Sequence, residues 1–460
     1  MSLINKMVLV FGAGKSGVAA ARLLLNIGAA VVLYDGDKAI DINTIEDKFD
    51  STKNLEVYFG EFPNNKLSQI NLMIISPGIA LDHPFVEEVR EKRIPIWGEM
   101  ELAYRYSKGK RIAITGTNGK TTTTSLVREI MNLFFSQVFV VGNIGNPYSD
   151  IALETTKDSV TVIEVSSFQL ETIHEFSPDV SAILNITADH LNRHHTMENY
   201  INLKKRIAKN QDKRNLCILN YEDTHTRNIG AKLHTRVMYF SSQHELNYGL
   251  YLDGDNILYK KDESIEHVCN INELRVLGKH SYENVMVGVG IAIEMGIPME
   301  IIHKAIISFN AVEHRIEYVD TIDGVSYYND SKGTNPDASI KAVQAMKAPT
   351  ILIGGGYDKG LSFDEWVSSF NGKVKALVLM GETREKIAAT ARNHGFNHII
   401  LVNDLKEAVH ISADMADSGD AVLLSPACAS WGMFDNYEQR GIMFKEYIKE
   451  LRNSRWKIAD

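Results

Sequence analysis

The sequence has few cysteines, no long apolar run and no excess of basic residues. Its three cysteines, Cys217, Cys269 and Cys428, lie far apart, and none has the spacing of a metal-binding pair. Such a set argues against a disulfide framework or a structural zinc site and favours a reducing, cytoplasmic compartment. No apolar stretch approaches the roughly 18–20 residues that cross a bilayer, so we expect no membrane partner.

The charge balance argues against another class of protein. The chain carries 49 basic and 58 acidic residues, a formal net charge of −9. A nucleic-acid binder usually carries a basic domain or stripe, so we expect no nucleic-acid partner. A small anionic ligand needs only backbone N–H groups and one or two cations, which this composition allows. We therefore expect an enzyme with small-molecule substrates. As a separate expectation, we take the chain to be a monomer.

Strand-length apolar runs alternate with helix-length segments along all 460 residues, which is the pattern of α/β domains with parallel sheets. At roughly 150 residues per domain, this length predicts three domains. We place them at residues 1–98, 99–311 and 312–460, with Rossmann-like folds at both ends and a P-loop ATPase-like sheet between them. The pattern loosens over residues 97–110 and becomes polar over residues 220–272, whose architecture is not predicted.

The expected strands alternate with the expected helices. They cover residues 7–11, 31–34 and 72–75 in the first domain, residues 111–115, 138–141, 160–165 and 180–186 in the second, and residues 325–328, 350–353, 376–380, 398–402 and 421–424 in the third. Because ligands bind beyond the carboxyl ends of strands in such sheets, polar residues directly after a strand are the candidates for function.

The strongest motif is the loop Thr-Gly-Thr-Asn-Gly-Lys-Thr at residues 115–121, between a predicted strand and a predicted helix. Glycines let its N–H groups turn inward toward phosphate oxygens, and the helix N-terminus adds the positive end of its dipole. Lys120 is expected at the β- and γ-phosphates, and the Thr121 hydroxyl at Mg²⁺. The loop departs from the standard P-loop, because Ile114 stands at the first glycine position. We interpret it as an ATP site made of Gly116, Thr117, Asn118, Gly119, Lys120, Thr121 and Thr122.

A second glycine loop, Gly-Ala-Gly-Lys-Ser-Gly at residues 12–17, also follows a predicted strand, and Asp35 comes about 20 residues later. This pattern alone is typical of NAD-binding proteins. Any nucleoside diphosphate, including a UDP-sugar, satisfies the same physics. The loop at residues 76–78, after another strand, is expected to line the same crevice.

Two further residues follow strands of the ATP domain. Glu164 offers a carboxylate, which suits Mg²⁺, and His190 offers an imidazole for positioning a γ-phosphate. Because Mg²⁺ prefers oxygen ligands, the residue types alone leave the role of His190 open.

Lys204 lies on a predicted helix. Helical spacing sets it on an inner face with Ile201 and Ala208, and turns Lys205 and Arg206 outward. From the residues alone, the simplest interpretation of this segment is a solvated basic face.

The third domain offers three polar loops after strands, at residues 329–336, 354–360 and 425–431. At one sheet edge they would form a pocket of Asp, Lys and Ser side chains. His314 and Arg315 lie at the domain junction, where Arg315 could bring a cation to a developing phosphate charge. Cys428 is a weak candidate nucleophile, because no histidine is near it in sequence, and packing explains it equally well.

These ordered motifs resemble those of the Mur ligases of bacterial peptidoglycan synthesis along nearly the whole chain. The matching segments include residues 115–121, 142–145, 164–169, 185–190, 329–332 and 425–430 and the residues Lys204, His280, Asn284, His314 and Arg315. The two C-terminal loops resemble those of the members that add D-glutamate. The resemblance implies an ADP-forming ligase that adds D-glutamate to UDP-N-acetylmuramoyl-L-alanine through an acyl phosphate.

The resemblance also implies roles for individual residues. The UDP substrate would be bound by Gly14, Lys15, Ser16, Asp35, Ser76, Pro77, Gly78 and Asn143. ATP would in addition contact Asn284, Arg315 and Asp330, the last at its ribose. D-Glutamate would be surrounded by Lys332, Thr334, Lys359, Ser430 and Tyr437. The catalytic residues would be Lys120, Glu164, His190, Lys204 and Arg315.

Two Mg²⁺ ions would be held by Thr121, Glu164, His190 and Lys204. In the family the lysine matching Lys204 is carbamylated, which converts a cation into a carboxylate-like ligand. Two positions depart from the family pattern, because Asn192 and Gly432 stand where relatives often carry aspartate. We expect the first to matter little and the second to loosen the loop that binds the acceptor amino acid.

Three other functions are weighed against this one. Another amino-acid-adding ligase of the same core would carry a different acceptor loop at residues 329–332. An NAD-dependent oxidoreductase would leave the loop at residues 116–121 unexplained. A non-catalytic nucleotide-binding protein would have no need of Glu164, His190 and Lys204 together.

Overall fold

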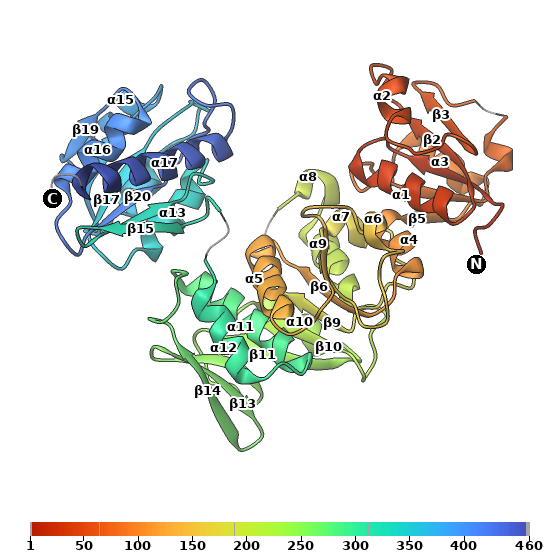
Figure 1. Ribbon diagram of the computed structural model, residues 1–460, viewed down its shortest axis with the longest axis horizontal. Coiled ribbons are helices and arrows are strands. Elements are labelled where there is room, and N and C mark those ends of the chain that lie inside the picture. The colour runs from red at the N-terminus through yellow and green to blue at the C-terminus, as the bar shows by residue number, and fades with distance from the viewer. Residues whose placement is uncertain (1, 64, 188, 311–312, 457–460) are drawn as a thin grey trace. The chain divides into compact units, whose positions relative to one another are not determined.

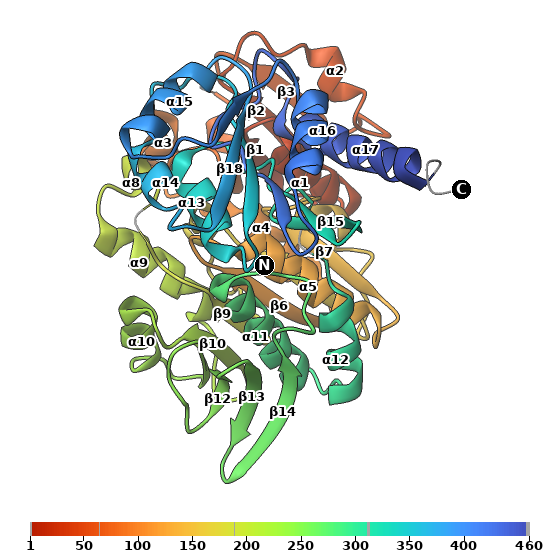
Figure 2. The ribbon, with the colours of Figure 1, turned by 90° about the vertical axis from the view of Figure 1, so that its left-hand side faces the viewer.

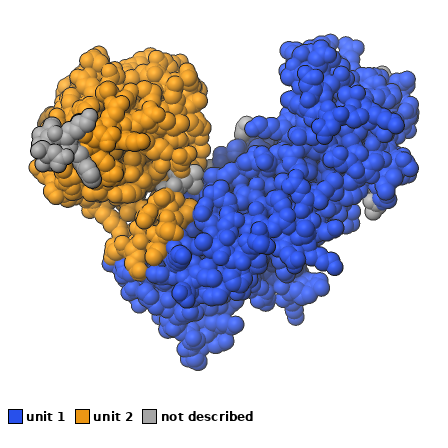
Figure 3. Space-filling view, in the orientation of Figure 1, with its two compact units in different colours: residues 1–270, 283–306 blue, residues 271–282, 307–460 orange. Residues whose placement is uncertain are grey.

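The computed structural model describes residues 2–63, 65–187, 189–310 and 313–456 and is an α/β protein with three domains, one for each of its sheets (Figure 1). Its contacts divide the chain into two compact units (Figure 3). The first unit comprises Met1–Asn270 and Glu283–Ile306 and holds two sheets. The second comprises Ile271–Tyr282 and Ile307–Asp460 and holds the third sheet. No helix of the described residues has the length and apolar character needed to cross a membrane.

The first sheet has five parallel strands in the order β3-β2-β1-β4-β5, with β1 at its centre. Strand β1 is apolar on both faces, as expected for a central strand of a parallel sheet that is covered on both sides. Four of its five residues are buried. Its elements are β1 Met7–Phe11, α1 Lys15–Asn26, β2 Ala30–Asp35, α2 Ile42–Glu46, β3 Leu55–Phe59, β4 Leu72–Ile75, α3 Pro84–Glu91 and β5 Ile96–Gly98.

The second sheet has nine strands in the order β14-β13-β12-β11-β10-β9-β6-β8-β7. The strands from β7 to β12 pair in parallel, and β12, β13 and β14 form an antiparallel meander that is seen at the lower end of Figure 2. The strands are β6 Lys110–Thr115, β7 Val138–Gly142, β8 Val160–Glu164, β9 Val180–Ile183, β10 Leu216–Asn220, β11 Arg236–Ser241, β12 Gly249–Asp253, β13 Asn256–Lys261 and β14 Ser264–Asn270. The helices are α4 Glu99–Tyr106, α5 Lys120–Asn132, α6 Tyr148–Ile151, α7 Ser167–Leu170, α8 Leu191–His194, α9 Met197–Lys205, α10 Thr224–Gly230, α11 Lys279–Glu294 and α12 Met299–Ser308.

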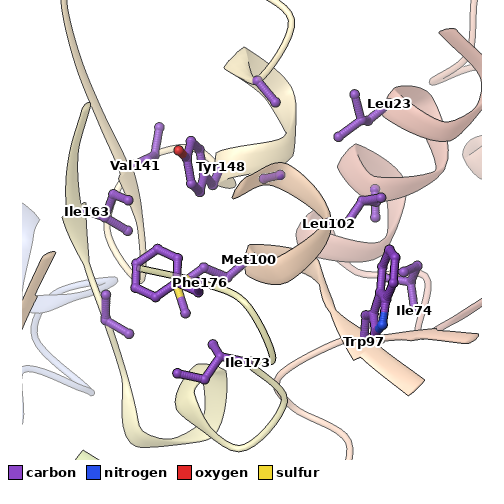
Figure 4. Packing of buried hydrophobic residues seen from close by; sticks show 14 of the residues in the cluster. Leu23, Ile74, Trp97, Met100, Leu102, Val141, Tyr148, Ile163, Ile173 and Phe176 are labelled. Carbon is purple, nitrogen blue, oxygen red and sulfur yellow. The ribbon is translucent and has the colours of Figure 1, made fainter. Parts of the chain in front are cut away.

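The two domains of the first unit share one continuous hydrophobic core. Helix α4 lies between them and contributes Met100 and Leu102, which pack between Leu23 of α1 and Phe176 of the central domain (Figure 4). All four side chains are almost fully buried. Apolar burial at this junction, at roughly 25 cal/mol per Å², therefore holds the first two sheets together as one body.

The second unit has six strands in the order β15-β16-β20-β17-β18-β19. Only the edge strand β15 runs antiparallel to its neighbour among the described strands of this sheet. Its elements are β15 Glu317–Ile322, β16 Val325–Asn329, α13 Pro336–Ala345, β17 Thr350–Gly354, α14 Asp364–Ser368, β18 Val374–Leu379, α15 Arg384–Asn393, β19 Ile399–Leu401, α16 Leu405–Met415, β20 Ala421–Leu424 and α17 Tyr437–Trp456.

The structure departs from the sequence-based expectations in several places, among them the buried central strand β10, which was not predicted. The loosened pattern at residues 97–110 is in fact the buried helix α4, whose two glutamates are enclosed by polar partners. Strand β9 ends at Ile183 and not at residue 186, because the next residues bend toward the loop of residues 115–121. Strands β3, β5 and β15 were missed because each is a half-buried or very short edge strand.

The predicted domain boundaries stay predictions. Gly98 is the last residue of β5 and caps α4, at the first predicted boundary. The second predicted boundary, at residues 311 and 312, lies outside the described residues.

Glu101 on α4 generates a test of this junction. Its fully buried carboxylate accepts the backbone N–H groups of His174 (2.8 Å), Glu175 (3.0 Å) and Phe176 (3.1 Å) and an ion pair from Arg105 (2.9 Å). Glu101→Ala leaves these donors unpaired, so we expect unfolding to become easier by about 3 kcal/mol. The measurement is urea denaturation followed by circular dichroism.

Glu175→Gln is the matched control, because the Glu175 side chain pairs with the same arginine but is 67% exposed. An exposed ion pair contributes less than about 1 kcal/mol, so this variant should unfold like the wild type. Equal destabilisation by both variants would contradict the role given to Glu101.

Candidate active site

The predicted phosphate loop lies between β6 and α5 and is held from outside. Thr117 N–H donates to the Asn185 carbonyl (2.9 Å), and Asn118 N–H donates to the Asn185 side-chain oxygen (2.8 Å). Gly119 has φ of +85°, and a Cβ there would lie 2.6 Å from the Asn284 side-chain oxygen. Helix α5 begins at Lys120, directly after this turn. The loop therefore presents the N-terminus of a thirteen-residue helix, which is a site for anions.

Two lysines meet at this loop. Lys120 Nζ donates to the carbonyls of Gly116 (2.9 Å) and Thr117 (2.8 Å). Lys204 Nζ, from α9, donates to the same Gly116 carbonyl (2.8 Å) and lies 4.6 Å from the centre of the Tyr200 ring. Burial, together with the nearby Lys120 ammonium, lowers the pKa of Lys204 to about 7. A substantial fraction of Lys204 is therefore an uncharged amine near neutral pH.

The expectation of a solvated basic face is wrong for this helix. Lys204 is 1% exposed, and Arg206, predicted to point outward, is half-buried and donates to the Ile173 carbonyl (2.8 Å). The inner face predicted for Lys204 is confirmed. Arg206 turns inward because the chain tightens into a short 3-10 turn after α9, which moves it off the helical spacing.

Glu164 at the end of β8 is a buried carboxylate with one unpaired oxygen. Its Oε1 accepts the Asn143 side-chain N–H (2.8 Å), and its Oε2 has no hydrogen-bond partner in the described part of the chain. An unpaired buried carboxylate oxygen costs free energy unless a ligand binds it. Carboxylate oxygen is also the ligand type that Mg²⁺ prefers, so Glu164 fits a divalent cation. Asn143, predicted to contact the UDP substrate, contacts this carboxylate in the structure.

His190 lies at the surface at the start of α8. Its side chain is 49% exposed, its Nε2 is 3.4 Å from Asp189, and its ring is 5.0 Å from that of Phe168. The described residues contain no group of three or more His, Cys, Asp or Glu side chains that could hold a metal ion. Ala188 and the side chain of Asn192 lie outside what the structure describes.

The N-terminal glycine loop is closed by Asp35 and Ser76. Asp35 accepts the N–H groups of Ala13 (2.8 Å) and Asp37 (3.1 Å), one on each carboxylate oxygen. Ser76 Oγ donates to the Gly12 carbonyl (3.3 Å). The structure thus brings the predicted UDP-binding residues of this domain to one sheet edge, at the N-terminus of α1. Asp35 shapes the loop itself, which the spacing alone did not indicate.

The second unit brings together the loops predicted to bind D-glutamate. Lys332 Nζ donates to the Tyr437 hydroxyl (3.1 Å) across 105 positions of sequence, and Thr334 N–H donates to the Lys332 carbonyl (2.8 Å). Lys359 Nζ lies 5.3 Å from the Trp431 ring. Ser430, which precedes Trp431 in the chain, is also buried. Their role toward D-glutamate stays a prediction.

Three residues predicted to contact ATP have different surroundings. Asn284 lies against Gly119 of the phosphate loop. Asp330 and Arg315 belong to the second unit. The Asp330 carboxyl is buried and accepts the Ser425 hydroxyl (2.7 Å), and burial raises its pKa to about 7. Arg315 is exposed.

Arg440 on α17 is a buried residue in the segment of residues 439–441, which belongs to the resemblance but received no predicted role. Its guanidinium donates to the Ser331 carbonyl (2.7 Å) and hydroxyl (2.9 Å) and to the Cys428 carbonyl (3.2 Å). It therefore joins two of the three predicted acceptor loops. Its contacts could not be predicted from sequence, because only the fold places a helix start between loops about 100 residues apart.

Cys428 supports packing and not catalysis. Burial raises the pKa of its thiol to about 11, and its Sγ is 3.3 Å from the Thr383 hydroxyl. Such a thiol holds too little thiolate near neutral pH to act as a nucleophile.

The fold and the phosphate loop define a class, namely three-domain α/β proteins that bind a nucleotide in the central domain. Models of the Mur ligase family match this chain in three segments. They are the Mur ligase MurD-like N-terminal domain at residues 6–98, the Mur ligase middle domain at residues 114–292 and the Mur ligase glutamate ligase domain at residues 314–428. The chain belongs to the Mur ligase family.

Curated relatives match the chain from end to end. UDP-N-acetylmuramoylalanine--D-glutamate ligase of Lachnoclostridium phytofermentans is 53% identical over 453 residues, which cover 98% of this chain and 100% of the relative. The proteins of the same name from Lachnospira eligens and Clostridioides difficile are 52% and 44% identical, with 98% of this chain and 100% of each relative covered.

Solved structures share the fold. MurF from Acinetobacter baumannii superposes with a TM-score of 0.60 at 15% identity, covering 96% of this chain and 94% of that one. MurF from Thermotoga maritima in complex with ADP gives 0.57 at 17% identity, with 97% and 96% covered. At such low identity the likeness shows the fold alone.

The tight turn at Gly119 generates a prediction about nucleotide binding. In Gly119→Ala the new methyl group would meet the Asn284 side chain at 2.6 Å and the backbone would keep a φ that alanine rarely adopts. We expect the affinity for ATP to fall by about tenfold or more, because the loop must open to relieve this contact. Titration with a fluorescent ATP analogue measures it.

Gly296→Ala is the control, because Gly296 has φ of +77° but open space around its Cβ position. Alanine at this position incurs a similar free-energy cost for its positive φ, but the position lies outside the phosphate loop. This variant should therefore bind ATP like the wild type. Unchanged ATP affinity in Gly119→Ala would contradict the proposed loop geometry.

Proposed function

We propose that this chain is an ATP-dependent ligase that joins D-glutamate to UDP-N-acetylmuramoyl-L-alanine, releasing ADP and phosphate, in the synthesis of peptidoglycan precursors. The observation that carries the proposal is the 53% identity, over 98% of this chain and 100% of the relative, with a protein named for this reaction. The phosphate loop, its two lysines and the buried carboxylate of Glu164 supply the chemistry that the reaction needs.

The reaction proceeds in two steps. The L-alanine carboxylate of the UDP substrate attacks the γ-phosphorus of ATP, and the bond to the bridging oxygen breaks to give ADP and an acyl phosphate. The amine of D-glutamate then attacks the acyl carbon and loses a proton, and phosphate leaves with the electron pair of the C–O bond. Both steps gather negative charge on oxygen atoms, which fixed cations stabilise.

Lys120 and Arg315 are the cations assigned to this charge. Lys120 lies at the start of α5, where the helix dipole adds to its field. Its ammonium donates to two backbone carbonyls of the loop, and we expect these bonds to exchange for phosphate oxygens when ATP binds. Arg315 is exposed in the second unit. Asn284, against the loop, and Asp330 complete the ATP contacts in this proposal.

Mg²⁺ accompanies ATP in the proposal, with two ions assigned to Thr121, Glu164, His190 and Lys204. When bound, it neutralises the negative charge of the phosphates. Glu164 supports one position through its unpaired buried oxygen. Lys204 supports the other as a carbamate, because an uncharged amine is the form that reacts with carbon dioxide and its pKa of about 7 keeps much of it uncharged.

The substrate assignments follow the geometry of each sheet edge. The loops of residues 12–17 and 76–78 bind the UDP group, with Asp35 holding the first loop in shape. Lys332, Thr334, Lys359, Ser430 and Tyr437 bind D-glutamate, whose two carboxylates call for cations such as Lys332 and Lys359. Gly432, at φ of +82°, stands where relatives often carry aspartate and leaves this loop without that carboxylate. The reaction is assigned to the cytoplasm, in keeping with a chain whose few cysteines are all buried, and to a monomer.

The assay of first choice measures phosphate release from ATP with UDP-N-acetylmuramoyl-L-alanine and one amino acid at a time. D-Glutamate should give turnover. L-Glutamate, L-lysine, meso-diaminopimelate and a sample without acceptor should not, because the acceptor loops resemble those of ligases that add D-glutamate. Turnover with another acceptor would keep the ATP chemistry and reject the acceptor assignment.

Lys204→Ala tests the carbamate. We expect ligase activity to fall by at least about a hundredfold, since a charged group at the reacting phosphates is worth several kcal/mol. Acetate or formate added to this variant should restore part of the activity by supplying a carboxylate in the vacated space. Lys205→Ala, which changes the neighbouring lysine on the same helix, is the control and should stay active. Full activity in Lys204→Ala without additives would remove this lysine from the reaction.

A further inference from the structure

Arg193 connects the two domains of the first unit by a direct polar contact. Its Nη2 donates to the Ile79 carbonyl of the N-terminal domain (2.9 Å) and to Oε2 of Glu171 in the central domain (2.8 Å). The guanidinium also lies 5.0 Å from the centre of the Phe168 ring. Only 18% of the Arg193 side chain is exposed, so these contacts are largely shielded from water.

The central-domain side of this contact is itself fixed. The side chain of Glu171 is 9% exposed, and its second oxygen lies 3.5 Å from Nδ1 of His194. The His194 ring stacks on Tyr200 at 5.4 Å, and the Tyr200 hydroxyl is 3.2 Å from the Thr117 hydroxyl of the phosphate loop. The arginine is thus anchored to the same body that carries the ATP site.

The N-terminal side leads directly to the glycine loop. Ile79 closes a turn with Ser76, through a backbone hydrogen bond of 3.0 Å, and Ser76 Oγ donates to the Gly12 carbonyl. The turn at residues 76–79 is therefore held between Arg193 on one side and the loop of residues 12–17 on the other. These are the loops assigned above to the UDP group.

The position of Arg193 in the chain links this contact to the candidate active site. It lies on the four-residue helix α8, three residues after His190. One short segment therefore carries both a residue assigned to the reacting phosphates and the donor that holds the UDP-binding turn. Neither the sequence motifs nor the assigned roles explain why an arginine of the central domain binds the N-terminal domain here.

We propose that Arg193 is a positioning residue for the UDP substrate, because it fixes the turn of residues 76–79 to the central domain. The inference rests on the proposed function in assigning that turn to the UDP group. Without Arg193 the turn keeps its own hydrogen bonds but loses its anchor, so the cost should fall on the UDP substrate and much less on ATP or D-glutamate.

Steady-state kinetics test the consequence. Arg193→Ala should raise the KM for UDP-N-acetylmuramoyl-L-alanine by about tenfold, the effect of losing one charge-assisted hydrogen bond, while the KM values for ATP and D-glutamate stay within about twofold. Arg193→Lys should fall in between, because one ammonium cannot reproduce both bonds of the planar guanidinium. Equal rises in all three KM values, or none, would overturn the proposal.

Arg206→Ala is the matched control. Arg206 is also a half-buried arginine that donates to a backbone carbonyl, but its acceptor, Ile173, belongs to the same domain. Its loss should leave the KM for the UDP substrate unchanged. A rise as large as that of Arg193→Ala would show a general loss of packing and overturn the specific role.

Hydrogen–deuterium exchange of the ligand-free protein separates this inference from the proposed function. In Arg193→Ala the amides of residues 76–83 should exchange at least about fivefold faster, while those of residues 115–125 keep their wild-type rates, because only the turn loses its anchor. Unchanged exchange in residues 76–83 would overturn the anchoring itself. Faster exchange there, with no turnover of the UDP substrate by the wild type, would uphold the anchor and reject the proposed substrate.

Discussion

The shared hydrogen bond of Lys120 and Lys204 to one carbonyl, that of Gly116, is the interaction on which the candidate site depends. Burial disfavours the charged form of Lys204, and repulsion by the neighbouring Lys120 ammonium adds to this, so the pKa of Lys204 falls to about 7. The arrangement is stable when negative charge is present. Phosphate groups would supply it at Lys120, and a carbamate would supply it at Lys204 itself. The buried, unpaired oxygen of Glu164 marks the same region as a place for a cation.

The first unit is built to keep this region in register with the N-terminal domain. Helix α4 buries Met100 and Leu102 in a core shared by both domains, and its Glu101 accepts three successive N–H groups from the central domain. Arg193 adds a polar contact to the turn beside the N-terminal glycine loop. The second unit has its own sheet and core, and the buried Arg440 joins its acceptor loops. Charged side chains thus hold both the N-terminal glycine loop, through Asp35, and the predicted acceptor loops, through Arg440.

Much of the fold and of the candidate site could be predicted from sequence, since both follow from local pattern. The buried parallel strands are continuous apolar runs, and the phosphate loop needs its glycines and its lysine in a fixed order. Lys204 shows where this reasoning ends. A Lys-Lys-Arg triplet on a helix is normally a solvated face. Helical spacing turned its first lysine inward, but only the tertiary structure shows that this lysine binds the phosphate loop. Edge strands such as β15 were missed because one face is half-exposed and the apolar pattern is weak.

The sequence by itself determined the order of domains, the parallel sheets and the two glycine loops, because these depend on residues that are neighbours in the chain. Tertiary structure alone decided which distant residues meet. It placed Lys204 beside Lys120, gave the Asn143 side chain to Glu164, used Asp35 to shape the first loop and carried Arg193 to Ile79. The physical reason is that burial and hydrogen-bond geometry depend on the whole fold. The partner of a charged residue cannot be predicted from sequence, because only the fold brings the two residues together.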